Sequence, residues 1–571
     1  MMSEVVIKRH SAPPSVVLNV ALPPLVQAIL ARRGVTEAEQ LDLSTKRLPH
    51  FSQLKGITDA ASRVADAILS DQVICICGDF DADGATSTAL MVSVLRAMGA
   101  KRLHYIVPNR FADGYGLSPA VVAQAINLGA ELIITVDSGI SCHAGVNAAR
   151  AAGLQVVVTD HHLPGNELPN AHAIVNPNQP GCNFPSKAIA GVGVAFYVLL
   201  ALRQQLRERG QAVPNLADWL DLVALGTVAD VVKLDDINRI LVQQGLQRIR
   251  SGHCRPGIQA LLQVAGREPQ RLQASDLGFS LGPRINAAGR LDDMATGIEC
   301  LLAQDLPSAL ELAQQLDDFN RERRSIETSM RESAQHYVAE LQRDVVDLPA
   351  ILVLHQADWH QGVVGLVAGR MKEQVHRPVI AFAQADDGTL KGSARSIPGL
   401  HIRDLLERVH SLHPQLIERF GGHAMAAGLT LQPQHLEAFT TAVTAIAADW
   451  LSADQLTQTL WSDGELDASG FQRPFVELLE RLGPWGQGFA EPRFDGEFTV
   501  LQQRLVGEKH LKMVLEGPDR VTVDAIAFNI DVATWPDPTV QRIHALYALQ
   551  LNHFRGHTSV QLQLEHFVAL R

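Results

Sequence analysis

The sequence predicts an α/β protein whose first domain is a doubly wound parallel sheet. Apolar runs of strand length alternate with helical stretches between residues 72 and 158, the runs are rich in Val and Ile on both faces, and a glycine follows each helical stretch. Such strands, separated by single helices, are typical of a parallel sheet covered on both sides. The chain of 571 residues is too long for a single hydrophobic core. Because a domain typically has about 150 residues, further domains are expected.

The elements of this first domain follow one another in a regular order. We expect strands at residues 72–77, 102–107, 131–136 and 154–158, and helices at 85–98, 118–128 and 142–152. The glycines after these helices suit a left-handed C-cap. The longest apolar run, residues 188–202, is shorter than the roughly 20 residues that a membrane span needs, so a buried core helix is expected there.

The rest of the chain predicts a connecting helix, a second α/β region and a small barrel. Residues 308–348 contain neither Gly nor Pro and carry apolar residues at three- and four-residue steps, which indicates long helical structure. A strand at 350–354 and a helix near 362–374 indicate the second α/β region, and strict alternation at 559–565 indicates a barrel or small sheet. We therefore expect an N-terminal domain at 1–305, a connecting helix at 306–348, a second α/β domain at 349–452 and a β domain at 453–571.

Charge and cysteine content exclude several classes of protein. With 49 Lys and Arg against 61 Asp and Glu, the formal net charge is −12, so nucleic-acid affinity must come from local basic patches or bound metal. The six cysteines are far apart except for Cys75 and Cys77, which argues against a disulfide framework or a zinc ribbon. The N-terminal residues lack the apolar run of a signal peptide. We expect a cytoplasmic protein with no membrane segment.

Acidic and imidazole side chains follow three of the predicted strands. In open α/β sheets, ligands bind at the carboxyl ends of the strands, so these groups are expected to converge on one edge. They are Asp79, Asp81 and Asp83 after the first strand, Asp137 after the third, and Asp160, His161 and His162 after the fourth. If the chain stays extended beyond the first strand, its three carboxylates crowd one side. Unit charges about 4 Å apart repel by about 4 kcal/mol at an effective dielectric near 20, so bound cations are expected.

The ligand types indicate which cations fit. Oxygen ligands alone suit Mg²⁺ or Ca²⁺, whereas imidazole moves the preference toward Mn²⁺ and its neighbours. Asp230 follows an apolar run, and a metal is a better partner for a buried Asp there than an N-cap role. Adjacent histidines diverge, so His161 is assigned to a metal and His162 to the substrate or leaving group. The alternatives are solvated acidic turns and, for Asp83, a helix N-cap.

Several motifs resemble a known family. GDFDADG, VDSG, VVTDHH and GTVAD, in this order, resemble the four motifs of the DHH phosphoesterase superfamily. GPRINAAGR, WHQGVVGLVAGR, GSARS and GGHAMAAG also match, so nearly the whole chain resembles the bacterial RecJ family of single-strand-specific exonucleases. The resemblance implies a doubly wound DHH domain, a long connecting helix, a second α/β (DHH-associated) domain and a C-terminal OB-fold-like barrel.

The resemblance also implies a two-metal site and a reaction. Two Mn²⁺ or Mg²⁺ ions are implied, held by Asp81, Asp83, Asp137, His161 and Asp230. Asp79 and Asp160 either bind the ions themselves or contact the residues that do. The implied activity is 5′→3′ removal of mononucleotides from single-stranded DNA, in DNA repair and recombination. Many superfamily members have His two residues before the first motif Asp, where this chain has Cys77. Either that metal has a different ligand set or, as we favour, Cys77 is a buried strand residue.

Recognition of the DNA end is the next implication. An enzyme of this polarity must recognise a terminal 5′ phosphate, which suits a planar guanidinium. By resemblance, the residues of this phosphate pocket are Arg110, Ser393 and Arg395. The alternative for each of them is a surface loop residue.

Further residues are candidates for contact with the DNA strand. His423 lies among small residues that let a backbone approach closely. His360 precedes a helix start whose free N–H groups can hold a phosphate. Arg284 and Asn286 either bind DNA phosphates or brace loops, and Tyr115 is a candidate for stacking on a base.

Two other functions stay open at this point. One is a DHH phosphodiesterase that acts on short oligoribonucleotides or cyclic dinucleotides, although the barrel and the long helix favour a longer polymer. The other is a non-catalytic DNA-binding scaffold, which predicts lost ligands, whereas all four motifs are intact. The family resemblance implies a monomer with single-stranded DNA, single-stranded-DNA-binding protein and a repair helicase as partners.

Overall fold

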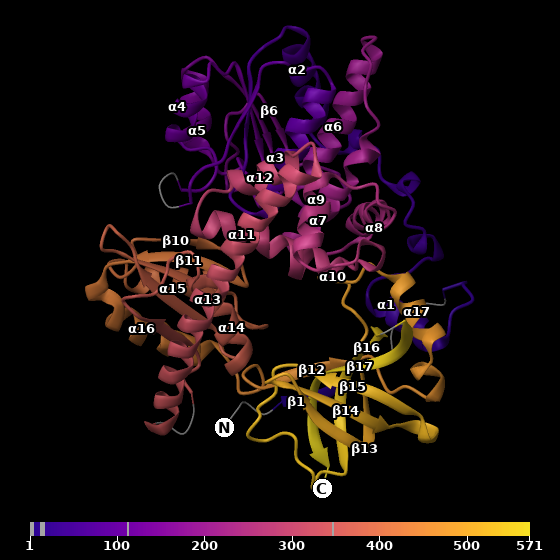
Figure 1. The fold of residues 1–571 in the computed structure, drawn as a ribbon. Helices are drawn as coiled ribbons and strands as arrows, with labels where there is room; N and C mark the ends of the chain where they lie inside the picture. Colours follow the sequence, from indigo (N-terminus) through magenta and orange to yellow (C-terminus); the bar gives the residue numbers. More distant parts are fainter. Residues whose placement is uncertain (1–4, 12–17, 111–113, 345–347, 555, 571) are drawn as a thin grey trace. The chain divides into compact units, whose positions relative to one another are not determined.

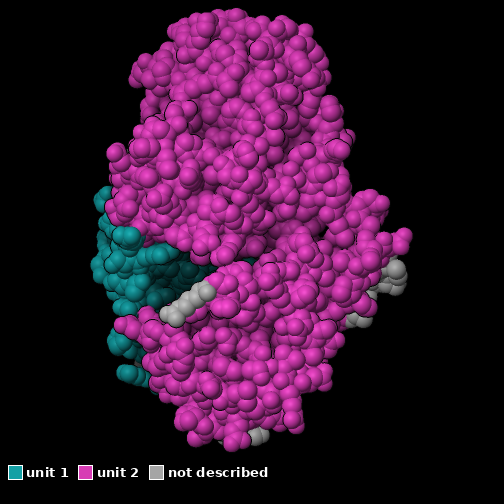
Figure 2. Space-filling model, turned by 45° about the vertical axis from the view of Figure 1, so that its right-hand side comes forward, with its two compact units in different colours: residues 1–8, 321–461 teal, residues 9–320, 462–571 magenta. Residues whose placement is uncertain are grey.

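The chain forms two compact units, which Figure 2 colours separately. Residues 1–8 and 321–461 form unit 1, and residues 9–320 and 462–571 form unit 2. The structure is a computed structural model and describes residues 5–11, 18–110, 114–344, 348–554 and 556–570.

A five-stranded parallel sheet lies in unit 2, and it confirms the predicted doubly wound fold (Figure 1). Its spatial order is β3-β2-β4-β5-β6, and every neighbouring pair is parallel. The strands are β2 Ile74–Cys77, β3 Leu103–Ile106, β4 Leu132–Val136, β5 Gln155–Thr159 and β6 Ala173–Val175. The four predicted strands are present. The fifth, β6, was not predicted because three residues are too few to show a pattern.

Helices cover both faces of this sheet. Ile74 and Ile76 of β2 pack in the cluster that includes α3 Ala82–Ala97 and α6 Gly191–Glu208. Cys75 and Cys77 point to the opposite face, into an apolar cluster with α4 Pro119–Asn127 and α5 His143–Ala151. Cys77 is therefore a buried strand residue on the face covered by α4 and α5, as favoured from the sequence.

Helices extend unit 2 beyond the sheet. They are α2 Ile57–Leu69, α7 Leu220–Ala229, α8 Asp236–Arg250, α9 Pro256–Val264, α11 Gly282–Leu291 and α12 Ala295–Leu302. The predicted long helix is α13, Leu306–Asp344, with 39 residues. The boundary between the two units falls within it, between residues 320 and 321. Its predicted end at 348 cannot be compared, because residues 345–347 lie outside the described residues.

Unit 1 contains the second α/β fold. Its sheet has the order β10-β11-β9-β8-β7, in which only β7 and β8 run parallel. The strands are β7 Leu352–His355, β8 Val379–Gln384, β9 Leu390–Arg395, β10 Arg419–Gly422 and β11 Ala426–Leu431. The helices are α14 Val364–Val375, α15 Ile402–Leu412 and α16 Leu436–Trp450.

The C-terminal residues form a closed barrel, as the alternating pattern predicted. Its order is β13-β14-β15-β17-β16, and the parallel pair of β15 with β17 is part of the closure. The strands are β13 Phe494–Val506, β14 His510–Glu516, β15 Thr522–Ala527, β16 Arg542–Phe554 and β17 His557–Leu570. Leu511, Met513 and Leu515 alternate into its core. Among the described helices of the whole chain, none combines the length and apolarity needed to cross a membrane.

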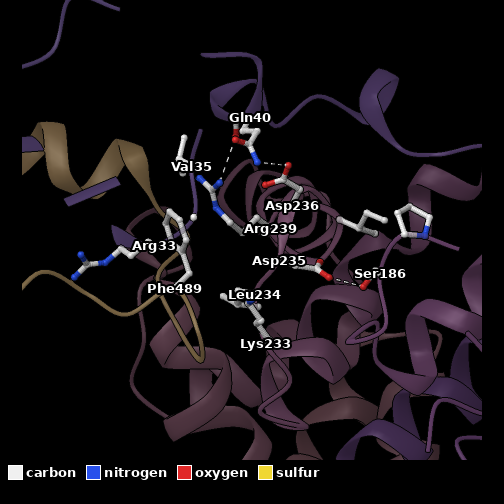
Figure 3. Close-up of a pocket in the computed structure, with 13 residues that line it drawn as sticks. Arg33, Val35, Gln40, Ser186, Lys233, Leu234, Asp235, Asp236, Arg239 and Phe489 are labelled. Carbon is white, nitrogen blue, oxygen red and sulfur yellow. Dashed lines mark hydrogen bonds between the residues drawn. The ribbon is translucent and has the colours of Figure 1, made fainter. Parts of the chain in front are cut away.

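A buried arginine joins the barrel's leading loop to α8. Arg239 is 1% exposed, and its guanidinium lies 3.9 Å from the ring centre of Phe489. It donates to the carbonyl oxygens of Gln40 (3.3 Å) and Leu482 (3.2 Å). Figure 3 shows Arg239 beside Gln40 and Phe489 at a pocket. This one side chain therefore ties three segments of unit 2 together.

Replacing this arginine should weaken unit 2. We expect Arg239→Ala to lower the free energy of unfolding by about 2–4 kcal/mol, because it opens a cavity and leaves two partly buried carbonyls without this donor. Denaturant unfolding followed by tryptophan fluorescence measures this, since Trp485 stacks on Phe489. The control is Arg271→Ala, which removes an exposed pair with Glu268 and should cost less than about 0.5 kcal/mol. Equal losses in both variants would contradict the prediction.

Candidate metal centre

The loop after β2 turns directly into a helix. Asp81 is the N-cap of α3, and its Oδ1 accepts hydrogen bonds from the N–H groups of Asp83 and Gly84, both at 3.0 Å. The expectation that the chain stays extended through Asp83 is therefore wrong, and so is the alternative that Asp83 is the cap. The helix begins at Ala82, three residues earlier than predicted, because the side chain of Asp81 supplies the missing acceptors.

The carboxylate of Asp83 is held by another helix. The N–H of Gly191 donates to its Oδ2 (2.7 Å), and the N–H of Val192 donates to its Oδ1 (2.9 Å). Both donors belong to the first turn of α6. Asp83 is only 1% exposed, so these donors stabilise a carboxylate that has little water around it.

Asp160 holds the two histidines that follow it. Its Oδ1 accepts from the N–H groups of His161 (2.7 Å) and His162 (3.1 Å) and lies 2.8 Å from Nδ1 of His162. Its Oδ2 accepts from the N–H of Ile140 at 2.9 Å. Both oxygens of Asp160 therefore have protein partners, and this carboxylate fixes the turn that carries the two histidines.

Three carboxylates surround one imidazole nitrogen. Nε2 of His161 lies 3.1 Å from Oδ1 of Asp137, 3.5 Å from Oδ2 of Asp230 and 4.0 Å from Oδ2 of Asp83. These segments are far apart in sequence, and the fold brings them together at the carboxyl ends of β4 and β5 and at the end of α7. The sequence prediction that these side chains converge is consistent with this geometry.

Unsatisfied atoms test whether cations fit here. Within the described part of the chain, four buried atoms of this cluster have no hydrogen-bond partner: Oδ1 of Asp79, Oδ1 of Asp137, Nε2 of His161 and Oδ2 of Asp230. Buried polar atoms without partners are costly, and bound divalent cations would give all four atoms a partner. Ligand atoms lie within 4.8 Å of one another in the groups Asp83–His161–Asp230, Asp79–Asp81–Asp137 and Asp137–His161–His162. The residues present fit two neighbouring cations.

Within this cluster, the pKa values of the carboxylates and of His161 are shifted in opposite directions. Burial, reinforced by neighbouring carboxylates, raises the pKa of Asp79, Asp137 and Asp230 well above the usual range and raises the pKa of Asp83 to about 7. Burial lowers the pKa of His161 to about 4. A neutral imidazole whose Nε2 carries no proton can bind a metal. The raised pKa values of the carboxylates show that the cluster has too little positive charge around it, which a cation would supply.

His162 differs from His161 in both charge and exposure. Burial opposes its charge, yet the hydrogen bond to Asp160 prevails and raises the pKa of His162 to about 9. Its side chain is 36% exposed, against 11% for His161. The hydroxyl of Tyr115 lies 3.3 Å from Nδ1 of His162 and donates to the backbone carbonyl of Asp137 at 3.3 Å, so Tyr115 contacts the site at both residues.

The other candidates in unit 2 surround this cluster. The guanidinium of Arg110 lies 3.9 Å from the ring centre of Phe80, and its Nε donates to the carbonyl of Gly289. Asn286 accepts from the N–H of Ala82 at 2.8 Å, which braces the start of α3. Arg284 is paired with Asp317 at 2.8 Å. Arg284 and Asn286 thus have the contacts of bracing residues, and DNA contact by either stays a prediction.

The remaining candidates lie in unit 1. Ser393 and Arg395 are on β9, where Nη1 of Arg395 donates to the Oγ of Ser393 at 3.1 Å. Gly365 packs against both, since a Cβ on it would lie 2.8 Å from that Oγ. Nδ1 of His360 accepts from the N–H of Gly362 at 3.1 Å, just before α14. His423 lies between β10 and β11.

Comparisons with known proteins agree with this architecture. The model of the DHH family, N-terminal domain, matches residues 73–227, that of the DHHA1 domain matches 348–449, and that of the RecJ OB domain matches 462–566. A Dickeya dadantii protein named single-stranded-DNA-specific exonuclease RecJ is 55% identical over 556 residues, or 96% of each chain. The protein of that name from Escherichia coli K12 is 52% identical over 575 residues, or 99% of each chain.

Solved structures extend the likeness to three dimensions. RecJ from Thermus thermophilus in complex with Mn²⁺ has a TM-score of 0.82 at 29% identity, covering 100% of this chain and 80% of that one. Its complex with Mg²⁺ has a TM-score of 0.76 at 27% identity, covering 100% and 79%.

The parallel sheet with carboxylates and a histidine at its carboxyl edge defines a metal-binding phosphoesterase of the DHH class. Sequence identities of 55% and 52% over nearly the full length narrow this class to one family. The chain belongs to the RecJ family of single-stranded-DNA-specific exonucleases. Its cofactors are divalent cations, Mn²⁺ or Mg²⁺, for which the clustered carboxylates and His161 are suited.

Metal binding should depend on pH. The metal-free carboxylates have raised pKa values, about 7 for Asp83, so below that pH protons compete with the cation, and Mn²⁺ affinity should rise as pH rises through about 7. Isothermal titration should show proton release and an affinity about tenfold weaker at about pH 6 than at about pH 8. Buffers of different ionisation enthalpy provide the control. Binding without proton release and with the same affinity at both pH values would contradict this.

Proposed function

We propose that this protein is a metal-dependent exonuclease that degrades single-stranded DNA in the 5′→3′ direction and releases 5′-mononucleotides. The observation that carries the proposal is the cluster of partnerless ligand atoms at the sheet edge, seen within the described residues, in a member of the RecJ family. The relatives at 55% and 52% identity are named for single-stranded DNA, and DNA of this kind is the substrate. The polarity and the product are proposed from the family resemblance.

The side chains of the site divide into metal ligands and a proton donor. Two bound cations would activate a water and stabilise the leaving oxygen of a phosphodiester. We propose as metal ligands Asp79, Asp81, Asp83, Asp137, His161 and Asp230. Asp160 orients His162, and the charged imidazolium of His162 is placed to give its proton to the 3′ oxygen that leaves. The oxygen of the water bonds to phosphorus as the bond between phosphorus and this 3′ oxygen breaks, and the water loses a proton to solvent. The shortened strand therefore keeps a 5′ phosphate.

A strand that is shortened in this way presents the same end group after every cycle. We propose that Arg110, Ser393 and Arg395 bind this 5′ phosphate. Burial of Arg395, which lowers its pKa without removing its charge, strengthens a charge-assisted hydrogen bond to phosphate. His360, His423, Arg284 and Asn286 are proposed as contacts to the following nucleotides.

The substrate is proposed to be a long polymer. A closed barrel of this kind commonly binds single strands, which supports a polymer over short oligoribonucleotides or cyclic dinucleotides. The complete ligand set argues against a non-catalytic scaffold. By family resemblance, we propose a cytoplasmic monomer that acts in DNA repair and recombination with single-stranded-DNA-binding protein and a repair helicase. The proposed domains are residues 1–305, 306–348, 349–452 and 453–571.

Removing one metal ligand tests the reaction. Among the described residues, Oδ2 of Asp230 has no hydrogen-bond partner, so Asp230→Asn removes a ligand charge with little structural change. Mn²⁺-dependent nucleotide release from end-labelled single strands should fall by about 100-fold or more, because several kcal/mol of charge stabilisation are lost. Circular dichroism checks the fold, and Asp66→Asn, which alters an exposed pair with Arg209, is the control. Release at the wild-type rate by Asp230→Asn would refute the assignment.

Removing a guanidinium tests the phosphate pocket. Arg395→Ala should lower kcat/KM on 5′-phosphorylated single strands by about tenfold or more, since a charge-assisted hydrogen bond contributes about 1.5–3 kcal/mol. Strands that begin with a 5′ hydroxyl should be cleaved as by the wild type. Arg419→Ala, on β10 of the same sheet, is the matched control. Equal losses of kcat/KM on 5′-phosphorylated and 5′-hydroxyl strands would show that Arg395 does not bind the 5′ phosphate.

A further inference from the structure

The first turn of α6 lies against two carboxylates of the metal centre at once. The cap residue Ala190 offers no side-chain hydrogen bond, and the first N–H groups of a helix have no partner within it. Two of them, from Gly191 and Val192, donate to the two oxygens of Asp83 at 2.7 and 2.9 Å. The helix start therefore fixes how Asp83 is turned.

The same turn contacts Asp137 through the missing side chain of Gly191. A Cβ at Gly191 would lie 2.4 Å from Oδ1 of Asp137 and 2.7 Å from both its Cβ and its Cγ. Real Cβ atoms do not approach other atoms this closely, and two of the three atoms are fixed to the backbone or next to it. Among the described residues, Oδ1 of Asp137 accepts no hydrogen bond. Packing against Gly191 therefore limits where this carboxylate can be.

Asp137 has little freedom to move away. Its φ is 58°, in the left-handed region that residues other than glycine rarely adopt, and the residue is 1% exposed. A side chain at position 191 would therefore displace either the helix start, with its two hydrogen bonds to Asp83, or the carboxylate of Asp137. Either shift changes the separation between these two carboxylates.

We propose that Gly191 is a positioning residue that sets this separation and thereby couples the two cation positions. Asp83 groups with His161 and Asp230, whereas Asp137 groups with Asp79 and Asp81 and also with His161 and His162. One backbone turn thus contacts one carboxylate from each group. The inference rests on the metal site of the proposed function and adds a residue that bears no ligand atom.

A second glycine in the same helix offers a matched control. A Cβ at Gly193 would lie 2.5 Å from Cγ1 and 2.9 Å from Cδ1 of Ile189. These contacts are as tight as those at Gly191, but they involve the flexible end of an apolar side chain and no metal ligand. Gly193→Ala therefore reproduces the change in helix propensity and the crowding, but its added methyl group meets only the side chains of Ile189 and Leu241 within 4 Å and no carboxylate of the metal centre.

The first experiment compares metal binding in the two variants. Titration calorimetry with Mn²⁺ should give an affinity about tenfold or more weaker for Gly191→Ala than for the wild type, with Gly193→Ala unchanged. The electron paramagnetic resonance spectrum of bound Mn²⁺ should change in Gly191→Ala only, because it reports the coupling between two neighbouring ions. On single-stranded DNA, Gly191→Ala should lower kcat and leave KM unchanged. Wild-type affinity and spectrum in Gly191→Ala, or equal losses in Gly193→Ala, would overturn the proposal.

The second experiment needs neither metal nor activity and covers the case in which Gly191→Ala does not fold. Asp137→Gly removes all three atoms that a Cβ at position 191 would meet, and glycine suits a φ of 58°. With chelator present, Gly191→Ala should lower the unfolding temperature in the wild-type background and have no effect in the Asp137→Gly background. Equal effects in both backgrounds would show that Asp137 is not what Gly191 accommodates. This result stands even if no nuclease activity is found.

Discussion

The burial of several neighbouring carboxylates is the constraint on which this structure depends, because loss of water and then mutual repulsion both oppose their charges. Asp79, Asp83 and Asp137 are each no more than 3% exposed, and without compensation their charges would be expelled or neutralised. The fold compensates Asp83 and Asp160 with backbone N–H groups. It leaves single atoms of Asp79, Asp137, His161 and Asp230 without a partner within the described chain. Carboxylate oxygens held by backbone donors and polar atoms without a partner thus lie beside one another in one cluster.

The order of strands explains why these groups can meet. Asp79, Asp137 and Asp160 follow β2, β4 and β5, which are adjacent in the sheet although their first residues, Ile74, Leu132 and Gln155, are far apart along the chain. Parallel neighbours present their carboxyl ends side by side. Asp230 comes from the end of α7, and α6 contributes backbone donors. The strand ends therefore supply most side chains of the cluster, while the helical layer adds Asp230 and the backbone donors to Asp83.

Period and composition were enough to predict the parallel sheet and the long helix, because each depends on patterns within a single segment. The alternation near the C-terminus predicted a barrel or a small sheet, and the family resemblance implied the barrel. The start of α3 was misplaced, since an acidic turn has the same composition whether it stays extended or, as with Asp81, caps a helix. The contacts of Asn286 with Ala82 and of Gly191 with Asp83 span 204 and 108 residues. No local pattern encodes such pairs, so the bracing and positioning groups of the site required the structure.

The adjacent histidines show how one carboxylate can give two equal side chains different tasks. Oδ1 of Asp160 accepts from both backbone N–H groups, so it fixes the turn from which the imidazoles diverge, yet it contacts only the ring of His162. That ring gains a pKa of about 9, while burial leaves His161 with a pKa of about 4. Near neutral pH one ring therefore carries a proton and the other a free lone pair. A carboxylate bonded to both rings would instead favour the charged form of both, and a charged imidazole has no lone pair to offer a metal.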